Sequence, residues 1–174
     1  MDLKKWHIAG IVFTIILGTL DHFIYGWSGD NPLAAPFCAV NESTWEHLKL
    51  LVAPMLLFTC FEYFIYGKYR PGFFTIRSLS ILSGMLFIIA VFYGYTALAG
   101  DNYLWADILT FILAVLTAFL LSYFLMKRNL FSSGSVEVTA RVITAALIVC
   151  FILFTLNPPH IFLFEDPVTG RFGM

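Results

Sequence analysis

The sequence predicts an all-α membrane protein, a bundle of transmembrane helices that forms a single integral membrane domain over residues 1–174. Of these residues 60% are hydrophobic, 18% are aromatic and 12% are charged, whereas an ordinary soluble domain is about 45–50% apolar and about 25% charged. The hydrophobic residues are concentrated in long runs, as transmembrane helices require. This composition excludes a soluble enzyme and a disordered protein. The net charge of −1 provides no basic field that would attract nucleic acid.

Five apolar stretches are long enough to cross the hydrocarbon core, which takes about 20 residues of α-helix. We predict spans at about residues 7–27, 44–67, 73–98, 104–126 and 137–156, followed by a C-terminal tail over residues 157–174. The first span follows Met-Asp-Leu-Lys-Lys, which resembles the start of a signal peptide. Because no small-x-small cleavage site follows it, we expect this helix to be retained.

Cap and turn residues mark the ends of the predicted helices. Ser43 and Glu46 are spaced as a capping box, which makes Ser43 the N-cap of the second span. Pro54 lies inside that span, and because proline has no N–H we expect a kink and a free carbonyl near Leu50. The other boundaries are Pro71-Gly72 before the third span, Gly100 to Asn102 before the fourth, and Pro158-Pro159 after the fifth.

The distribution of basic residues predicts the orientation. With the N-terminus in the cytoplasm, eight of the ten lysines and arginines lie at or near the inner side, and only Lys49 and Arg171 lie outside. This asymmetry follows the positive-inside rule, so we expect a multi-pass protein of the cell (plasma) membrane with its C-terminal tail outside. Interfacial tryptophans fit this orientation, with Trp6 at the inner interface and the others, Trp27, Trp45 and Trp105, at the outer one.

Histidines and carboxylates collect in the outer half of the predicted bundle. At 1.5 Å per helical residue, His22 lies about 7 Å below Trp27 and His47 about 3 Å below Trp45. The two imidazoles can therefore share one layer on neighbouring helices, and His160 can fold back over the same mouth from the tail. Ionisable groups within a span are costly and by default mark a functional site.

This set of side chains suits a metal-dependent enzyme. Histidine and carboxylate ligands fit zinc or non-haem iron, so we predict a zinc cofactor held by His22, His47 and His160. A carboxylate beside such a metal is a candidate general base, and the candidates are Asp21, Glu42 and Glu46. Neighbouring polar or aromatic residues are candidates for substrate binding: Tyr25, Asn41, Trp45 and Lys49.

Each of these residues also has an ordinary structural interpretation. His22 and His47 can form a hydrogen-bonded pair that ties two helices together. Glu46 can act only as a capping residue, or can pair with Lys49 on one helix face. The sequence contains no H-E-x-x-H, G-x-S-x-G, Walker or C-x-x-C motif that would decide between these interpretations.

The remaining charged residues and the cysteines have simpler predicted roles. Glu62 lies about 24 Å along the helix from Glu46, so we expect it to pair with an inner cation such as Arg77. Glu137 and Arg141, spaced i, i+4, are expected to pair with each other. The three cysteines are far apart and predict no disulfide framework, although Cys38 lies in a loop where a thiol could react.

Three segments carry a family resemblance: Asp21-His22-Phe23 with Tyr25, the block N-E-S-T-W-E-H-L-K over residues 41–49, and the tail from Pro158 to Gly173. Together they resemble a family of small bacterial integral membrane proteins that is catalogued only as a domain of unknown function. The resemblance covers nearly the whole chain, and the 41–49 block is its specific part. The tail ends Phe172-Gly173 where the family leads us to expect Tyr-Gly. The family implies the membrane layout and no particular activity.

The favoured hypothesis is a metal-dependent hydrolase embedded in the membrane, acting on a lipid or other amphiphile that enters from the outer leaflet. Two alternatives stay open. The same polar layer could bind or transport an ion, a proton or a small molecule without chemistry. The chain could also be a structural subunit of a larger membrane complex, because its loops are short and it has no soluble domain. The lipid bilayer is the expected partner in every case, and nucleic acid in none.

Overall fold

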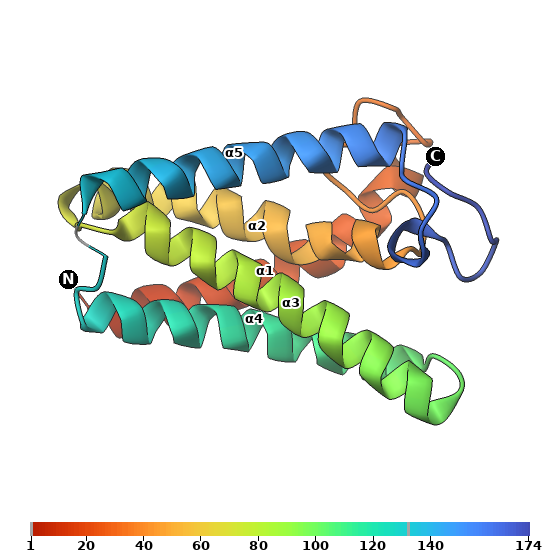
Figure 1. Cartoon of the computed structure of the whole chain (residues 1–174), viewed down its shortest axis with the longest axis horizontal. Helices are drawn as coiled ribbons and strands as arrows, with labels where there is room; N and C mark the ends of the chain where they lie inside the picture. Colours follow the sequence, from red (N-terminus) through yellow and green to blue (C-terminus); the bar gives the residue numbers. More distant parts are fainter. Residues whose placement is uncertain (1, 132) are drawn as a thin grey trace.

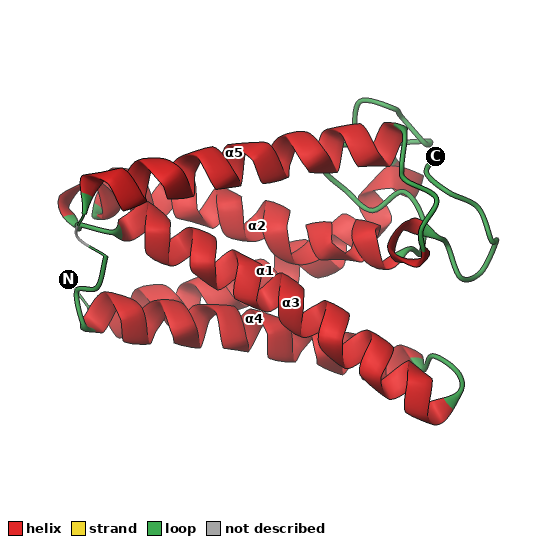
Figure 2. Cartoon of the chain, viewed as in Figure 1, coloured by secondary structure: helices red, strands yellow, loops and turns green. Residues whose placement is uncertain are grey.

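The computed structural model is a bundle of long helices that lie side by side (Figure 1). It describes residues 2–131 and 133–174, and within these residues five helices are long and apolar enough to cross a membrane. The prediction of an all-α membrane protein is confirmed, and Figure 2 shows helices joined by loops. The elements in order are α1 Leu3–Trp27, α2 Thr44–Ile65, the short 3-10 helix η1 Gly67–Tyr69, α3 Phe73–Ala99, α4 Leu104–Lys127, α5 Gly134–Leu156 and the 3-10 helix η2 Phe162–Phe164.

Successive helices run in opposite directions, so the chain ends lie at opposite ends of the bundle (Figure 1). The N-terminal end carries the start of α1 and the connections α2–α3 and α4–α5. The C-terminal end carries the α1–α2 loop, the α3–α4 turn and the tail after α5. The predicted histidine and carboxylate layer lies at the C-terminal end.

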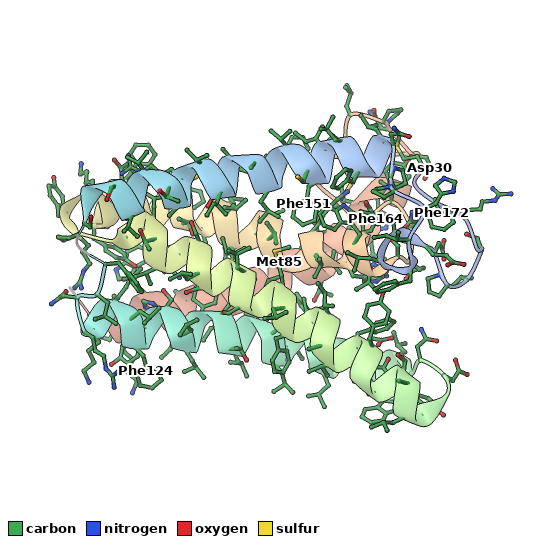
Figure 3. All side chains as sticks on the ribbon, viewed as in Figure 1. Asp30, Met85, Phe124, Phe151, Phe164 and Phe172 are labelled. Atoms are coloured by element: carbon green, nitrogen blue, oxygen red, sulfur yellow. The ribbon has the colours of Figure 1, made fainter. Side chains whose placement is uncertain are left out.

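Helix α2 is the central helix of the bundle and contacts α1, α3, α4 and η2. Its Trp45 is buried, with its ring 4.5 Å from that of Phe151 on α5 and 4.8 Å from that of Phe164 in the tail. Figure 3 shows these two phenylalanines close together at the C-terminal end. The prediction that Trp45 marks a lipid interface is therefore wrong, because this indole packs inside the protein and helps to hold the tail.

Helix α1 approaches the backbone of α2 closely about one turn from the histidines. A Cβ on Gly18 of α1 would lie 2.2 Å from the carbonyl oxygen of Leu50. That carbonyl is the one that Pro54 cannot bond, because proline has no N–H to donate to the residue four positions earlier. Glycine at position 18 therefore lets the two helices come into contact. His22 and His47 lie about one turn from this contact and are neighbours across the same helix pair.

Two predicted ion pairs are present at the N-terminal half of the bundle. Arg77 of α3 pairs with Glu62 of α2, and both side chains are buried. Arg141 of α5 approaches Glu137 at 3.7 Å, one turn apart. Both pairs match the sequence-based expectation, and the first ties α2 to α3 inside the bundle.

Candidate metal centre

His22, Glu42 and His47 come together at the C-terminal end of the bundle. His22 is in the last turns of α1, Glu42 is in the α1–α2 loop and His47 is in the first turn of α2. The carboxylate lies 3.4 Å from Nε2 of His47 and 3.9 Å from Nε2 of His22, and the imidazole centroids are 5.3 Å apart. One ligand atom from each residue lies within 4.8 Å of the others, so the group could hold a metal ion.

The orientation of His47 is set by its own helix. Nδ1 of His47 lies 3.0 Å from the carbonyl oxygen of Ser43, and a carbonyl can only accept, so Nδ1 carries the proton. In the neutral imidazole the lone pair is therefore on Nε2, which faces Glu42. A metal-binding histidine is commonly oriented by a hydrogen bond of this kind.

His22 offers the second imidazole. Its Nε2 faces the carboxylate of Glu42, while its Nδ1 is buried and bonds to no atom among the described residues. Both His22 and Glu42 remain part exposed. The group is therefore accessible from solvent on one side and backed by the helices on the other.

The segment that carries Glu42 is held by hydrogen bonds from both sides. Asn41 accepts from the backbone N–H of Ser43 at 2.9 Å and donates to the carbonyl of Gly173 in the tail at 2.9 Å. Ser43 caps α2 as predicted, accepting from the N–H of Glu46 at 3.3 Å. The reciprocal half of the capping box is absent among the described residues, because Glu46 instead accepts from the N–H of Val40 at 3.1 Å.

Glu46 and Lys49 form a buried latch rather than an open part of the site. Nζ of Lys49 donates to Glu46 at 2.6 Å and to the carbonyl oxygens of Ala35 at 2.9 Å and Cys38 at 3.2 Å. Thr155 of α5 bonds to both charged groups. Each charged side chain is 2% exposed, so this latch joins α2, α5 and the α1–α2 loop.

A cavity of about 150 Å³, here called the site cavity, opens beside the histidines. One side of it is lined by His22, Glu42 and His47, here called the metal group. The opposite side is formed mainly by apolar residues of α3 and α4, and the tail covers it with two further residues. The lining residues outside the metal group are Thr44, Leu50, Ile88, Phe92, Asn102, Leu104, Asp107, Thr110, Phe111, Pro167 and Val168.

Asp107 is a cavity residue that the sequence did not single out for the site. It lies in the first turn of α4 and accepts a hydrogen bond from the hydroxyl of Tyr95 on α3. Its position in the sequence predicts only a favourable charge near a helix N-terminus. Only the packing of α4 against α1 brings it to the same cavity as His22.

The other sequence-predicted residues lie around the metal group at various distances. Asp21 is buried at 7% exposure and is not among the residues that line the site cavity. The hydroxyl of Tyr25 donates to the sulfur of Met174 at 3.8 Å. His160 stacks on Phe172, with ring centroids 4.5 Å apart. His160 thus lies apart from His22 and His47, and the tail places its backbone, rather than this imidazole, next to the α1–α2 loop.

Tyr25 and Asn41 line a second hollow, a polar groove of about 460 Å³ between the tail and the α1–α2 loop. His22 and Glu42 line this groove as well as the site cavity. The metal group therefore separates a polar groove from a cavity with an apolar wall.

Cys38 in the α1–α2 loop is buried, and its thiol donates to the carbonyl oxygen of Ala34 at 3.0 Å. Burial raises the pKa of the Cys38 thiol to about 11, and the nearby Asp21 carboxylate acts in the same direction. The thiol is therefore protonated at neutral pH and packs as a small apolar group.

The fold and these contacts define a multi-pass membrane protein with a histidine and glutamate group near one end of its bundle. The chain belongs to a family whose description is "Family of unknown function (DUF6512)", and the family model matches residues 1–174. The resemblance inferred from the sequence is thereby confirmed. No curated protein and no solved structure matches the chain.

Proposed function

We propose that the protein binds a divalent metal, zinc, at His22, Glu42 and His47, and hydrolyses an amphiphile there. The observation that carries this proposal is that the ligand group meets at the boundary between the site cavity and the polar groove. Two imidazoles and one carboxylate form the ligand set of a class of catalytic zinc sites, in which a fourth position stays open.

The electrostatics of the group favour a cation between its members. The lone pair of Nε2 on His47 and a carboxylate oxygen of Glu42 face each other at 3.4 Å, and both are acceptors. Zinc bonds of about 2.0–2.2 Å require small rotations of these side chains toward a common point. The partial exposure of Glu42 permits such a rotation.

Zinc at this point would polarise a carbonyl or phosphoryl oxygen and lower the pKa of a water, which is the chemistry that hydrolysis requires. Two carboxylates line the site cavity, Glu42 and Asp107. Because Glu42 is a proposed metal ligand, we assign the role of general base to Asp107. In this scheme Glu46 belongs to the latch, and Asp21 lies outside the site cavity. The hydroxyl of Tyr95 orients the Asp107 carboxylate by its hydrogen bond.

The substrate side of the proposal follows from the shape of the site. The apolar wall on α3 and α4 would accept a hydrocarbon chain, and the polar groove beside Asn41 and Tyr25 would accept a polar group. With the N-terminus in the cytoplasm, as the distribution of basic residues indicates, the site opens toward the outer leaflet of the cell membrane.

A proton on Nε2 of His47 would also resolve the contact between this nitrogen and the Glu42 carboxylate, in place of a metal ion. If His47 is an imidazolium, its Nε2–H donates to Glu42, and the site holds a proton or an ion without catalysing a reaction. This is the binding or transport alternative. Metal analysis separates it from the enzyme, because an imidazolium and a zinc ion exclude each other at Nε2.

The test is elemental analysis of the purified protein without a histidine tag, beside His22→Ala, His47→Ala and Glu42→Gln. His160→Ala is the matched control, since this imidazole lies on Phe172. We expect near-stoichiometric zinc in the unmodified protein and the control, and loss in the other variants. Hydrolysis of a panel of ester and phosphodiester lipids should follow the same pattern. Absence of metal from every sample would overturn the proposal in favour of a proton or ion site.

A further inference from the structure

A basic pocket lies at the N-terminal end of the bundle, far from the metal group. It has a volume of about 340 Å³ and lies between the α2–α3 connection and the first turns of α5. Lys68, Arg70 and Arg141 line it together with the aromatic side chains of Tyr63 and Tyr69. The other lining residues are Gly67, Pro71, Gly72, Ser133, Gly134 and Glu137.

Glu137 is the acidic residue among the described residues that line this pocket, and its carboxylate is already engaged. It accepts from the backbone N–H groups of Phe74 at 3.0 Å and Thr75 at 3.2 Å, and from the Thr75 hydroxyl at 2.9 Å. Glu137 on α5 thus caps the N-terminus of α3, where the N-cap residue Gly72 has no side chain to do so. The pocket therefore holds three basic side chains, Lys68, Arg70 and Arg141, against this one carboxylate.

The N-terminus of α5 faces the same pocket and has no comparable cap. Ser133 is its N-cap, and the Ser133 side chain makes no capping bond to any described residue. Gly134 follows, and a Cβ at that position would meet no atom within 4 Å, so the start of the helix is open. Helix N-termini carry unpaired N–H groups and a partial positive charge that attract anions.

Arg141 lines the pocket, and its guanidinium has hydrogen-bond donors available for an anion. Its planar group lies over the ring of Phe74, 4.7 Å from the centroid, and reaches Glu137 only at 3.7 Å. Its side chain is 53% exposed, so most of its N–H donors are available. A guanidinium binds a phosphate through two parallel hydrogen bonds, which makes arginine the residue of choice for this anion.

We propose that this pocket binds a phosphate-bearing anion, supplied by the head group of an anionic phospholipid. The cations, the open α5 N-terminus and the cavity all favour the phosphate. The pocket lies where the apolar surface of the helices ends, and Tyr69 is 75% exposed there as interfacial aromatic residues are. Basic pockets between transmembrane helices on the cytoplasmic side are known to accept such head groups.

The proposal is independent of the metal site, and its test uses the full chain purified in a neutral detergent. Phosphatidylglycerol, phosphatidylcholine or inorganic phosphate is added, and the midpoint of thermal unfolding is measured. A ligand at about 100 times its Kd should raise Tm by about 5–10 °C in a protein of this size. We expect this rise with phosphatidylglycerol and a smaller rise, or none, with phosphatidylcholine.

Variants that remove basic residues of the pocket test whether the lipid binds there. The double variant Arg70→Gln/Arg141→Gln should lose the response to phosphatidylglycerol, and Lys68→Gln alone should weaken it. The control Lys5→Gln/Arg128→Gln removes the same charge from the same end but outside the pocket, and it should keep the full response. Comparison with the lipid-free Tm of each variant separates a loss of binding from a loss of folding.

The outcomes distinguish the sources of the phosphate. A response to inorganic phosphate that also needs Arg70 and Arg141 would support the anion site and assign it to a soluble phosphate rather than to a lipid. Equal responses of both lipids in all variants would overturn the proposal. So would a loss of the response in the Lys5→Gln/Arg128→Gln control, since the charge of the whole end would then be responsible.

Discussion

The carbonyl oxygen of Leu50 occupies the space beside Gly18 where any other residue would carry its side chain, 2.2 Å from the position of a Cβ. Pro54 leaves that oxygen without its helical partner, and the missing side chain at Gly18 lets α1 approach it. His22 follows Gly18 by one turn and His47 precedes Leu50 by about one turn. The contact therefore lies about one helical turn from both imidazoles, whose ring centroids are 5.3 Å apart.

Replacement of Gly18 by alanine is expected to push α1 away from α2. Overpacking of this kind costs about 1–3 kcal/mol, and the Tm in detergent should fall accordingly. Zinc affinity should fall by about 10- to 100-fold, the range typical of residues that orient metal ligands. Gly26→Ala on the same helix is the control, because a Cβ there meets no atom within 4 Å. Equal zinc affinity in the two variants would show that the contact between Gly18 and Leu50 does not position the metal ligands.

The sequence predicted the fold and part of the site because both depend on helix length and rise. Five apolar runs fix the spans, and counting along the first two spans places His22 and His47 in one layer. The sequence predicts Glu42 nearby as a base, and the structure brings its carboxylate to 3.4 Å from Nε2 of His47 and 3.9 Å from Nε2 of His22, in a group that could hold a metal ion.

The remaining site residues depend on how helices and loops rotate and pack, which the sequence pattern does not specify. Glu46 and Lys49 point toward α5 and the loop rather than into the site cavity, because Thr155 and two loop carbonyls supply their partners. Asp107 reaches the cavity through the packing of α4. His160 lies on Phe172 because the tail folds back on itself, with an isolated bridge between Glu165 and Phe172.

Removal of one member of the Glu46–Lys49 latch is expected to be more harmful than removal of both. Lys49→Met leaves the Glu46 carboxylate buried without its cation, and breaking a buried pair in this way costs about 3–5 kcal/mol. The double variant Glu46→Gln/Lys49→Met removes both charges and should recover much of that loss. Thermal unfolding in detergent measures both effects. A double variant as unstable as Lys49→Met would show that hydrogen bonds to the loop, rather than charge pairing, dominate the latch.

Cys38 is expected to resist alkylation at neutral pH although it lies in a loop. Its raised pKa of about 11 keeps the thiol protonated in the folded protein, and only the thiolate is nucleophilic. The rate of reaction with a water-soluble maleimide should therefore rise about tenfold per pH unit and level off only near pH 11. The measurement uses a variant that retains Cys38 alone, with Cys60 and Cys150 changed to serine. A matched cysteine at the exposed Ser28 should react quickly at pH 7, and similar rates at both positions would contradict the burial of Cys38.

Asp107→Asn tests the proposed chemistry separately from metal binding. The amide keeps the shape of the carboxylate but cannot accept a proton, and loss of a general base lowers the rate by about 10²- to 10⁴-fold. Zinc content should stay the same, because the proposed ligands are His22, Glu42 and His47 and the substitution leaves them unchanged. Tyr95→Phe removes the hydrogen bond to Asp107 and should lower the rate less while shifting the pH at which hydrolysis reaches half its maximum. The rate and the pH of half-maximal hydrolysis are both measured from the pH profile of lipid hydrolysis, with variants that retain their zinc. Full activity in Asp107→Asn would exclude this residue as the base and leave solvent to accept the proton.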